Sequence, residues 1–306
     1  MVNKKLAVVV NGWHFPKEFY KQIKEQKIPD GWEIDYFCVS HRDPEVSKSE
    51  KQKIIPQLGD SILEKLDKVL YKDIATVEYL EKNNWQYSLE PNTIGDWGCT
   101  NQWLEKHPNY RDYEILLLTH DDNWVIGDDL FECVLNERLE TLYRNNISVY
   151  GRGELQKTNK AESSEVPYEE DWLVISNGLV NSTAKVRGSF DFFKTSLIEK
   201  MGGSFDLSRV ELSRVGETDN MGVGAYGTNP PPNGMSMKDW EKPVQNYHNF
   251  MYQNKLVDKV RYLSPTYRVS YWCLEGERGL LSNRATPQRV IYESGVNDLI
   301  NMGRIS

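Results

Sequence analysis

The stretch Glu-Ile-Leu-Leu-Leu-Thr-His-Asp-Asp-Asn at residues 114–123 decides the fold of this chain. A run this apolar is typical of a strand buried on both faces, which occurs mainly in parallel sheets covered by helices. The run ends in His120, Asp121 and Asp122, so these side chains are expected at the carboxyl end of the strand, where open α/β sheets bind ligands. Adjacent carboxylates repel each other unless a cation or hydrogen bonds compensate. Hard oxygen ligands at such a position suit Mg²⁺ or Mn²⁺ carrying a substrate phosphate.

The segments on either side of this run alternate between strand and helix patterns. Strands are expected over residues 5–10, 33–39, 82–87, 147–150, 172–176, 260–263 and 267–271. Helices are expected over residues 17–25, 61–69, 99–106, 130–144, 194–200, 244–256 and 290–300, with a loop or exposed helix over 44–58. This alternation predicts βαβ units and an α/β fold with a mainly parallel central sheet flanked by helices.

The composition narrows the class of protein. The chain has 306 residues, which is enough for one large α/β domain or two modest ones. Its formal net charge of −8 argues against a nucleic-acid partner, because such proteins carry a basic footprint. No segment approaches the roughly 20 apolar residues that a transmembrane helix needs. The four cysteines are scattered without a metal-binding spacing, which disfavours zinc and disulfides and suits a reducing, cytoplasmic location.

Several polar motifs follow one another in a fixed order along the chain. They are Ser40–Asp43, Asn92–Asn101, His120–Asp122, Gly127–Leu130, Gly202–Asp206 and Gly216–Asp219. This order resembles that of the family 2 glycosyltransferases with the GT-A fold. In that family an Asn-x-Gly segment precedes a metal-binding Asp-x-Asp strand end, and a Gly-Gly-Phe-Asp-like turn precedes a Glu-Asp catalytic motif. The resemblance covers roughly residues 5 to 225.

The resemblance implies a GT-A domain over residues 1–230, with a nucleotide-binding part over about 1–125 and an acceptor part over about 126–230. Residues 231–306 would then form an irregular, acceptor-side C-terminal extension packed on the same domain. It also implies an inverting, metal-assisted hexosyl- or deoxyhexosyltransferase of glycan biosynthesis. Such an enzyme moves a sugar from a UDP-, GDP- or dTDP-linked donor to a hydroxyl of a glycan or glycoconjugate.

The resemblance carries site roles to individual positions. The residues implied for the nucleotide pocket are Val10, Asn11, Gly12, Ser40, His41, Asp43, Asn92, Gly95 and Asp121. Asp122, with His120, would hold Mn²⁺ or Mg²⁺ and the diphosphate. His120 stands where the family has its first carboxylate, so His120 or Asp121 substitutes for it, or one ligand is lost. Glu217 or Asp219 would be the general base, and the intervening Thr218 leaves open which of the two acts.

The chemistry of sugar transfer explains why these residue types are needed. The leaving nucleoside diphosphate is strongly anionic, so a divalent cation that bridges its phosphates stabilises the developing charge. The acceptor hydroxyl must lose a proton as it attacks, and general-base catalysis by a carboxylate contributes roughly 10²–10⁴-fold. Attack from the face opposite the leaving group inverts the anomeric centre.

Two other functions were weighed. A nucleotidyltransferase would need a basic, Gly-rich phosphate loop after the first strand, but residues 11–14 contain one glycine and no lysine, so this function is disfavoured. A non-catalytic nucleotide-sugar or carbohydrate-binding protein with a degenerate GT-A site stays open, because His120 and the split Glu217–Asp219 pair both depart from the family pattern. Asp128 and Asp129 are interpreted as charges at a helix N-terminus and not as ligands.

Overall fold

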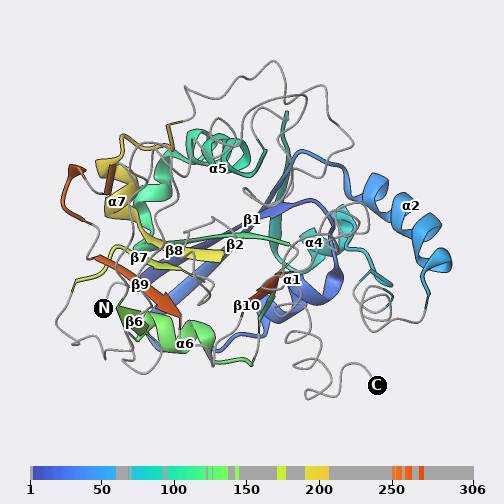
Figure 1. Cartoon of the computed structure of the whole chain (residues 1–306), viewed down its shortest axis with the longest axis horizontal. Coiled ribbons are helices and arrows are strands. Elements are labelled where there is room, and N and C mark those ends of the chain that lie inside the picture. Colours follow the sequence, from blue (N-terminus) through green and yellow to red (C-terminus); the bar gives the residue numbers. More distant parts are fainter. Residues whose placement is uncertain are drawn as a thin grey trace.

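The computed structural model describes residues 3–59, 68, 71–91, 95–121, 123–125, 127–136, 142–144, 171–176, 190–206, 250–251, 253–256, 259–263 and 269–271 (Figure 1). Its strands are β1 Lys4–Gly12, β2 Trp32–Ser40, β3 Trp85–Leu89, β4 Ile115–His120, β5 Asn123–Val125, β6 Leu142–Arg144, β7 Val174–Ser176, β8 Phe190–Lys194, β9 Val260–Leu263 and β10 Val269–Tyr271. Its helices are α1 Lys17–Lys24, α2 Pro44–Ile54, α4 Val77–Lys82, α5 Gly95–Lys106, α6 Leu130–Leu135 and α7 Thr195–Lys200, with 3₁₀ turns η1 Ile55–Gln57 and η2 Pro108–Asp112.

In the described ranges, eight strands form one sheet in the order β3-β2-β1-β4-β8-β7-β9-β6. The strands β3, β2, β1 and β4 are all parallel, and β8 then pairs antiparallel with β4. Beyond β8 the pairing is mixed, and β10 forms a separate antiparallel ribbon with β5. The predicted α/β fold with a mainly parallel central sheet is therefore confirmed.

The strand order reverses direction next to β1. The chain builds β1, β2 and β3 outward on one side and then returns to place β4 on the other side of β1. At such a switch point the connections leave the carboxyl ends of the two neighbouring strands in opposite directions, and a crevice opens between them. The topology thus points to the carboxyl ends of β1 and β4 as the place where this sheet binds a ligand.

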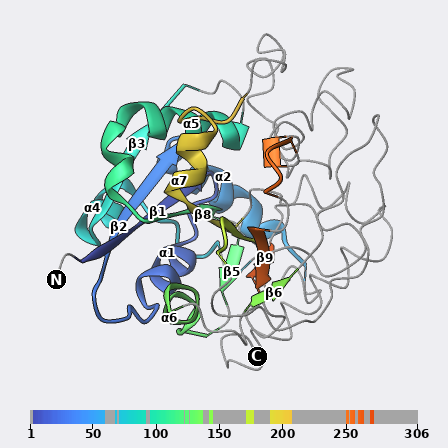
Figure 2. The same cartoon turned by 90° about the vertical axis from the view of Figure 1, so that its left-hand side faces the viewer.

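Helices cover both faces of the sheet, as Figures 1 and 2 show. The alternating side chains of β1 enter two separate apolar clusters: Leu6, Val8 and Val10 join the cluster that includes residues of α1 and α6, while Ala7 and Val9 join the one that includes residues of α5 and α7. Every side chain of β4 is buried, as its unbroken apolar sequence predicted. This double burial fixes the central strands, so their ends form a rigid platform.

One predicted helix is right at its start and wrong at its end. The pattern over residues 130–144 predicted a single amphipathic helix, but α6 ends at Leu135, and Leu142–Arg144 form β6, which pairs with β9. Five of the six residues of α6 are buried, so this helix has no extended polar face to continue. Pairing with a strand far along the chain overrides the local helical pattern beyond it.

The elements that the sequence patterns did not predict include β8 and α4. Residues 190–193 were expected only to lead into a helix, yet they begin β8, which lies between β4 and β7. Residues 77–82 form α4, whose N-terminus is capped by Thr76 accepting a hydrogen bond from the backbone N–H of Tyr79. The strand expected at 82–87 consequently starts later, at Trp85.

The other expectations concern the end of α7, three further elements, the C-terminal stretch and membrane-spanning helices. The helix α7 stops at Gly202 and Gly203 as predicted, and both glycines have positive φ angles, of 93° and 86°. The expected elements at residues 147–150 and 290–300 lie outside the described residues, as does all of 61–69 except Lys68. The stretch assigned to a C-terminal extension supplies β9 to the main sheet, while the division into parts stays a prediction. None of the described helices is both long and apolar enough to cross a bilayer.

Candidate functional site

Backbone pairing brings the polar ends of three parallel strands together. Asn11 at the end of β1 lies opposite His120 at the end of β4, and Gly12 lies opposite Ser40 at the end of β2. Asn11 and His120 are both buried, although they are polar. These four positions therefore share one edge of the sheet, and their predicted roles toward a nucleotide stay predictions.

Asp121 is tied to the loop that follows β1. Its Oδ2 accepts hydrogen bonds from the backbone N–H groups of Trp13, His14 and Phe15 at 2.9, 3.0 and 2.7 Å, and from the Tyr20 hydroxyl at 3.2 Å. The carboxylate is only 1% exposed. Burial raises the pKa of Asp121, and the hydrogen bonds from the loop amides oppose that rise. These hydrogen bonds come from the loop backbone and from Tyr20, and the predicted contact of Asp121 with the nucleotide or metal stays a prediction.

The loop held by Asp121 has an unusual backbone. Phe15 has a φ angle of 56°, in the left-handed region that residues with a side chain seldom adopt. Its fully buried ring turns back onto β1, where a Cβ added to Gly12 would lie 2.8 Å from Phe15 Cε1 and 2.9 Å from Cys38 Sγ. Only glycine leaves room for this packing, so Gly12 is required by the fold beneath the site.

The end of β2 is fixed by its own hydrogen bonds. The Ser40 hydroxyl lies within hydrogen-bond distance of the backbone oxygens of Gly12 and Arg42 and can donate its proton to either, and it accepts from the Arg42 N–H. His41 Nδ1 lies 3.3 Å from the backbone oxygen of Glu90, at the end of β3. Asp43 caps α2 by accepting from the Glu45 N–H at 2.8 Å. These contacts join the carboxyl ends of β1, β2 and β3. They give Ser40 and Asp43 structural roles in addition to the predicted contacts with a nucleotide.

Positive groups gather beside the loop. Lys51 of α2 is 2% exposed, and its ammonium lies 5.2 Å from the centroid of the Tyr71 ring. Arg42 stacks on Trp13 with its guanidinium carbon 5.0 Å from the ring centroid, and it forms an ion pair with Glu50. Burial lowers the pKa of His14 well below its usual value, and the charges of Lys51 and Arg42 add to this effect. Arg42 belongs to the polar motif at the end of the second strand, but its stacking on Trp13 and the burial of Lys51 could not be predicted from the sequence.

The buried imidazole of His14 should make the stability of the fold sensitive to acid. Among the described residues, its Nδ1 has no hydrogen-bond partner. Because the pKa of His14 is lowered in the folded state, the unfolded chain binds more protons below about pH 6.5, and stability falls as the pH drops through that value. We expect His14→Phe to unfold in urea with a weaker pH dependence than the wild type between about pH 6.5 and 5. Equal slopes for the two proteins would contradict this.

The other predicted site residues are placed as follows. The side chain of Val10 lies in the apolar core, so only its backbone can face a ligand. Gly95 is the first residue of α5. Asn92, Asp122, Glu217 and Asp219 lie outside the described residues, and their roles stay predictions. Within the described ranges, no group of three or more His, Cys, Asp or Glu side chains is arranged to hold a metal ion.

The carboxylate of Asp121 is engaged by the loop, because its oxygens accept N–H and O–H groups. Asp122 lies outside the described residues, so the predicted cation site of His120 and Asp122 stays a prediction. An imidazole nitrogen and a carboxylate oxygen are both ligand types that suit Mn²⁺.

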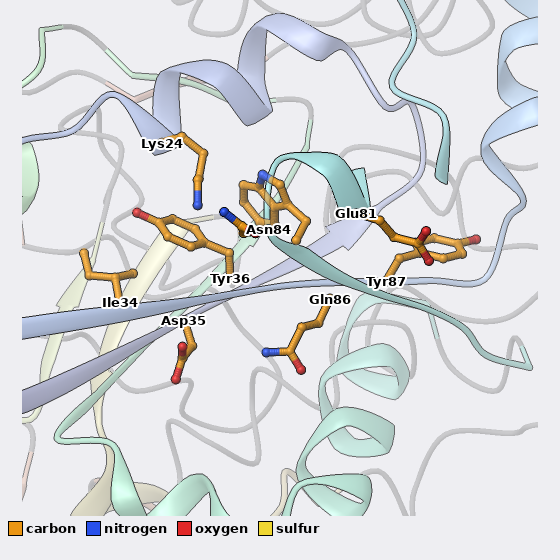
Figure 3. A pocket seen from close by; sticks show the side chains of 9 residues that line it. Lys24, Ile34, Asp35, Tyr36, Glu81, Asn84, Gln86 and Tyr87 are labelled. Atoms are coloured by element: carbon orange, nitrogen blue, oxygen red, sulfur yellow. The ribbon is translucent and has the colours of Figure 1, made fainter. Parts of the chain in front are cut away.

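A hollow of about 690 Å³ lies elsewhere on the molecule, along β2 and β3 before their carboxyl ends (Figure 3). Lys24 of α1 caps one side, with its ammonium 3.7 Å from the centroid of the Tyr36 ring. In Figure 3, Asp35 and Gln86 point to the other side of the strands from Lys24 and Tyr36. The hollow therefore runs around the sheet edge and shares none of the predicted site residues.

In the comparison with known proteins, matches are found among solved structures alone. No family model and no curated protein matches the chain. Among solved structures, S. aureus TarS is 13% identical with a TM-score of 0.43, over 94% of this chain and 41% of TarS. The chain thus spans about two fifths of that protein.

Two further structures are similar at the same low level. TarS 1–349 in complex with UDP-GlcNAc is 16% identical with a TM-score of 0.42, over 94% of this chain and 65% of that one. A UDP-glucose pyrophosphorylase complexed with UDP-glucose is 11% identical with a TM-score of 0.36, over 95% and 99%. At these identities and TM-scores the similarities identify neither a family nor a function for this chain, so any assignment must rest on the geometry of the strand ends.

Proposed function

We infer that this chain is a nucleotide-sugar-dependent glycosyltransferase of the GT-A type. The observation that carries the proposal is the meeting of Asn11, Ser40 and His120 at the switch point of the sheet, beside a loop held in one conformation by Asp121. Ligands of open α/β sheets bind at such a point. The order of polar motifs along the chain favours a sugar nucleotide as that ligand.

The nucleotide is assigned to the ends of β1 and β2. Asn11 and the backbone of Val10 and Gly12 form its floor, and His41 and Asp43 face the base or ribose. Asn92 and Gly95, at the start of α5, border the same pocket. Rigid strand ends suit this role, because binding a preorganised site costs little ordering of the protein.

The diphosphate is assigned to the positive groups beside the loop. Lys51 and Arg42 both lower the pKa of His14 electrostatically, which supports a positive potential at this position. A bound Mn²⁺ or Mg²⁺, held by His120 and Asp122, would supply further stabilisation of the leaving group. Buried positive charge is effective here because the surrounding protein screens it less than water does.

The acceptor is assigned to Glu217 and Asp219, the residues that the resemblance implies for the general base. One of these carboxylates accepts the proton of the attacking hydroxyl, and direct displacement then inverts the anomeric centre. The acceptor is a glycan or a glycoconjugate, and the sugar transferred is a hexose or deoxyhexose.

The first experiment is a binding screen of the wild-type chain. UDP-GlcNAc and UDP-glucose are the first probes, because the low-scoring structures hold them, and GDP- and dTDP-linked sugars follow. We expect one of these to bind with a Kd of about 1 μM–1 mM by calorimetry and to be hydrolysed slowly with Mn²⁺. Absence of both binding and hydrolysis across the panel, with and without Mn²⁺, would refute the proposal.

A second candidate is a nucleotide-sugar-binding protein without catalysis. His120 at the end of β4, where a carboxylate is usual, favours it, as does the engagement of Asp121 by the loop. It predicts binding of a sugar nucleotide with no hydrolysis and no transfer to any acceptor in a glycan panel.

A further inference from the structure

We propose that Asp121 is a positioning residue, whose buried carboxylate holds the loop Trp13–Phe15 in the conformation that meets the donor nucleotide. The inference rests on the proposed function for the identity of the ligand. Its structural part rests on contacts alone. Three consecutive backbone N–H groups converge on the single oxygen Oδ2.

The geometry resembles an anion-binding nest, in which successive N–H groups point at one negative group. Here the protein fills the nest with its own carboxylate. The amides of Trp13, His14 and Phe15 are therefore engaged and do not serve the phosphates of a ligand. The two roles therefore belong to different groups. Asp121 shapes the loop, whereas Lys51, Arg42 and the cation bind the diphosphate.

The loop needs such an anchor because its backbone is strained. Phe15 sits at a φ of 56°, and residues in this region persist only where surrounding contacts over-determine them. The Phe15 carbonyl accepts from the Ala75 N–H at 2.7 Å, and the Ser47 hydroxyl lies 3.2 Å from the carbonyls of Trp13 and His14. The carboxylate of Asp121 holds the opposite, N–H side of the same three residues.

The position of the loop explains why its shape matters for the donor. Trp13 follows directly on Gly12, the last residue of β1, at the switch point where the nucleotide is assigned. A loop released from Asp121 would let the Phe15 ring leave the surface of Gly12 and would change the floor of the pocket. The expected effect is on donor binding more than on the chemical step.

The test uses Asp121→Ala and Asp121→Asn, with Asp35→Asn as the matched control. Asp35 also accepts a tyrosine hydroxyl, from Tyr113 at 2.8 Å, but it lies in the middle of β2. Residue-resolved hydrogen exchange on the whole chain reads the loop amides without any ligand. We expect Asp121→Ala to speed exchange of residues 13–15 by at least about tenfold while residues 6–10 of β1 stay protected. Asp121→Asn keeps an acceptor oxygen, so it should partly restore the protection.

The second readout is the donor, once the binding screen has identified one. Asp121→Ala should raise its KM at least about tenfold with a smaller fall in kcat, Asp121→Asn should rescue part of this, and Asp35→Asn should match the wild type. Loop amides that exchange at wild-type rates, or faster exchange spread evenly over the sheet, would overturn the proposal. Faster loop exchange with unchanged donor KM would also overturn it. A wild-type chain that binds no sugar nucleotide refutes the proposed function instead, and the exchange experiment still reports on the loop.

Discussion

Asp122→Ala is expected to abolish sugar transfer, lowering kcat by about 10³-fold or more while the protein stays folded. The residue follows β4 in the sequence, and the proposed function assigns it, with His120, to the cation and the diphosphate. Its loss removes charge stabilisation from the leaving group, which is the largest contribution to this chemistry. The measurement is single-turnover transfer or hydrolysis of the donor identified by the binding screen, with saturating Mn²⁺.

The control for this variant is Asp128→Ala. Asp128 is also an aspartate just beyond the strand end, but it is exposed and forms a surface ion pair with Lys27, with Nζ and Oδ1 3.1 Å apart. Surface pairs contribute about 0–1 kcal/mol, so this variant should keep both stability and activity. If Asp122→Ala retains wild-type kcat, or if Asp128→Ala loses as much activity, the assignment of Asp122 fails.

Phe15→Ala is expected to lower the free energy of unfolding by about 3–5 kcal/mol and to weaken donor binding. The ring is fully buried and stacks on Tyr20, with centroids 6.4 Å apart and planes 9° apart. It also meets Tyr87 edge to face and covers Gly12. Alanine loses these contacts, and its Cβ makes the left-handed backbone as unfavourable as it is for Phe15. No gain in free energy therefore compensates for the cavity.

The matched variant is Phe131→Ala in α6. Phe131 is equally buried and packs against Phe192, with ring centroids 6.1 Å apart, but it is not part of the loop. Urea unfolding should show similar losses of stability for the two variants, whereas only Phe15→Ala should weaken binding of the donor. Equal affinities in the two folded variants would show that the loop does not shape the pocket.

The elements that sequence patterns predicted well contain long buried stretches. β4, most of β1 and the carboxyl half of β2 are buried because both faces of the sheet are covered, and their apolar runs can be identified without knowing which strands pair with them. β8 and β6 are short, and their identity depends on pairing with β4 and β9. A run such as Phe190–Phe193 fits a strand or a helix lead-in equally well until its neighbour is known.

Some features of the candidate site could likewise be predicted from the sequence, and others could not. A polar residue after a buried run marks a strand end, so Asn11, Ser40 and His120 could be placed together from sequence. The direction of the Asp121 side chain could not, because it depends on amides of Trp13–Phe15 more than 100 positions earlier. Nor could the burial of Lys51, which follows from how α2 packs against the loop.

The place of β9 within the sheet bears on how the chain folds during synthesis. Residues 260–263 lie between β7 and β6 and not at an edge, so that half of the sheet cannot close until the ribosome has released them. The parallel block of β3, β2, β1 and β4 uses only residues up to 120 and can assemble long before. Before β9 is synthesised, the edge of β7 that later pairs with it has unpaired backbone N–H and C=O groups. Such an edge can pair with other chains, and chaperones limit this kind of aggregation in proteins of this size.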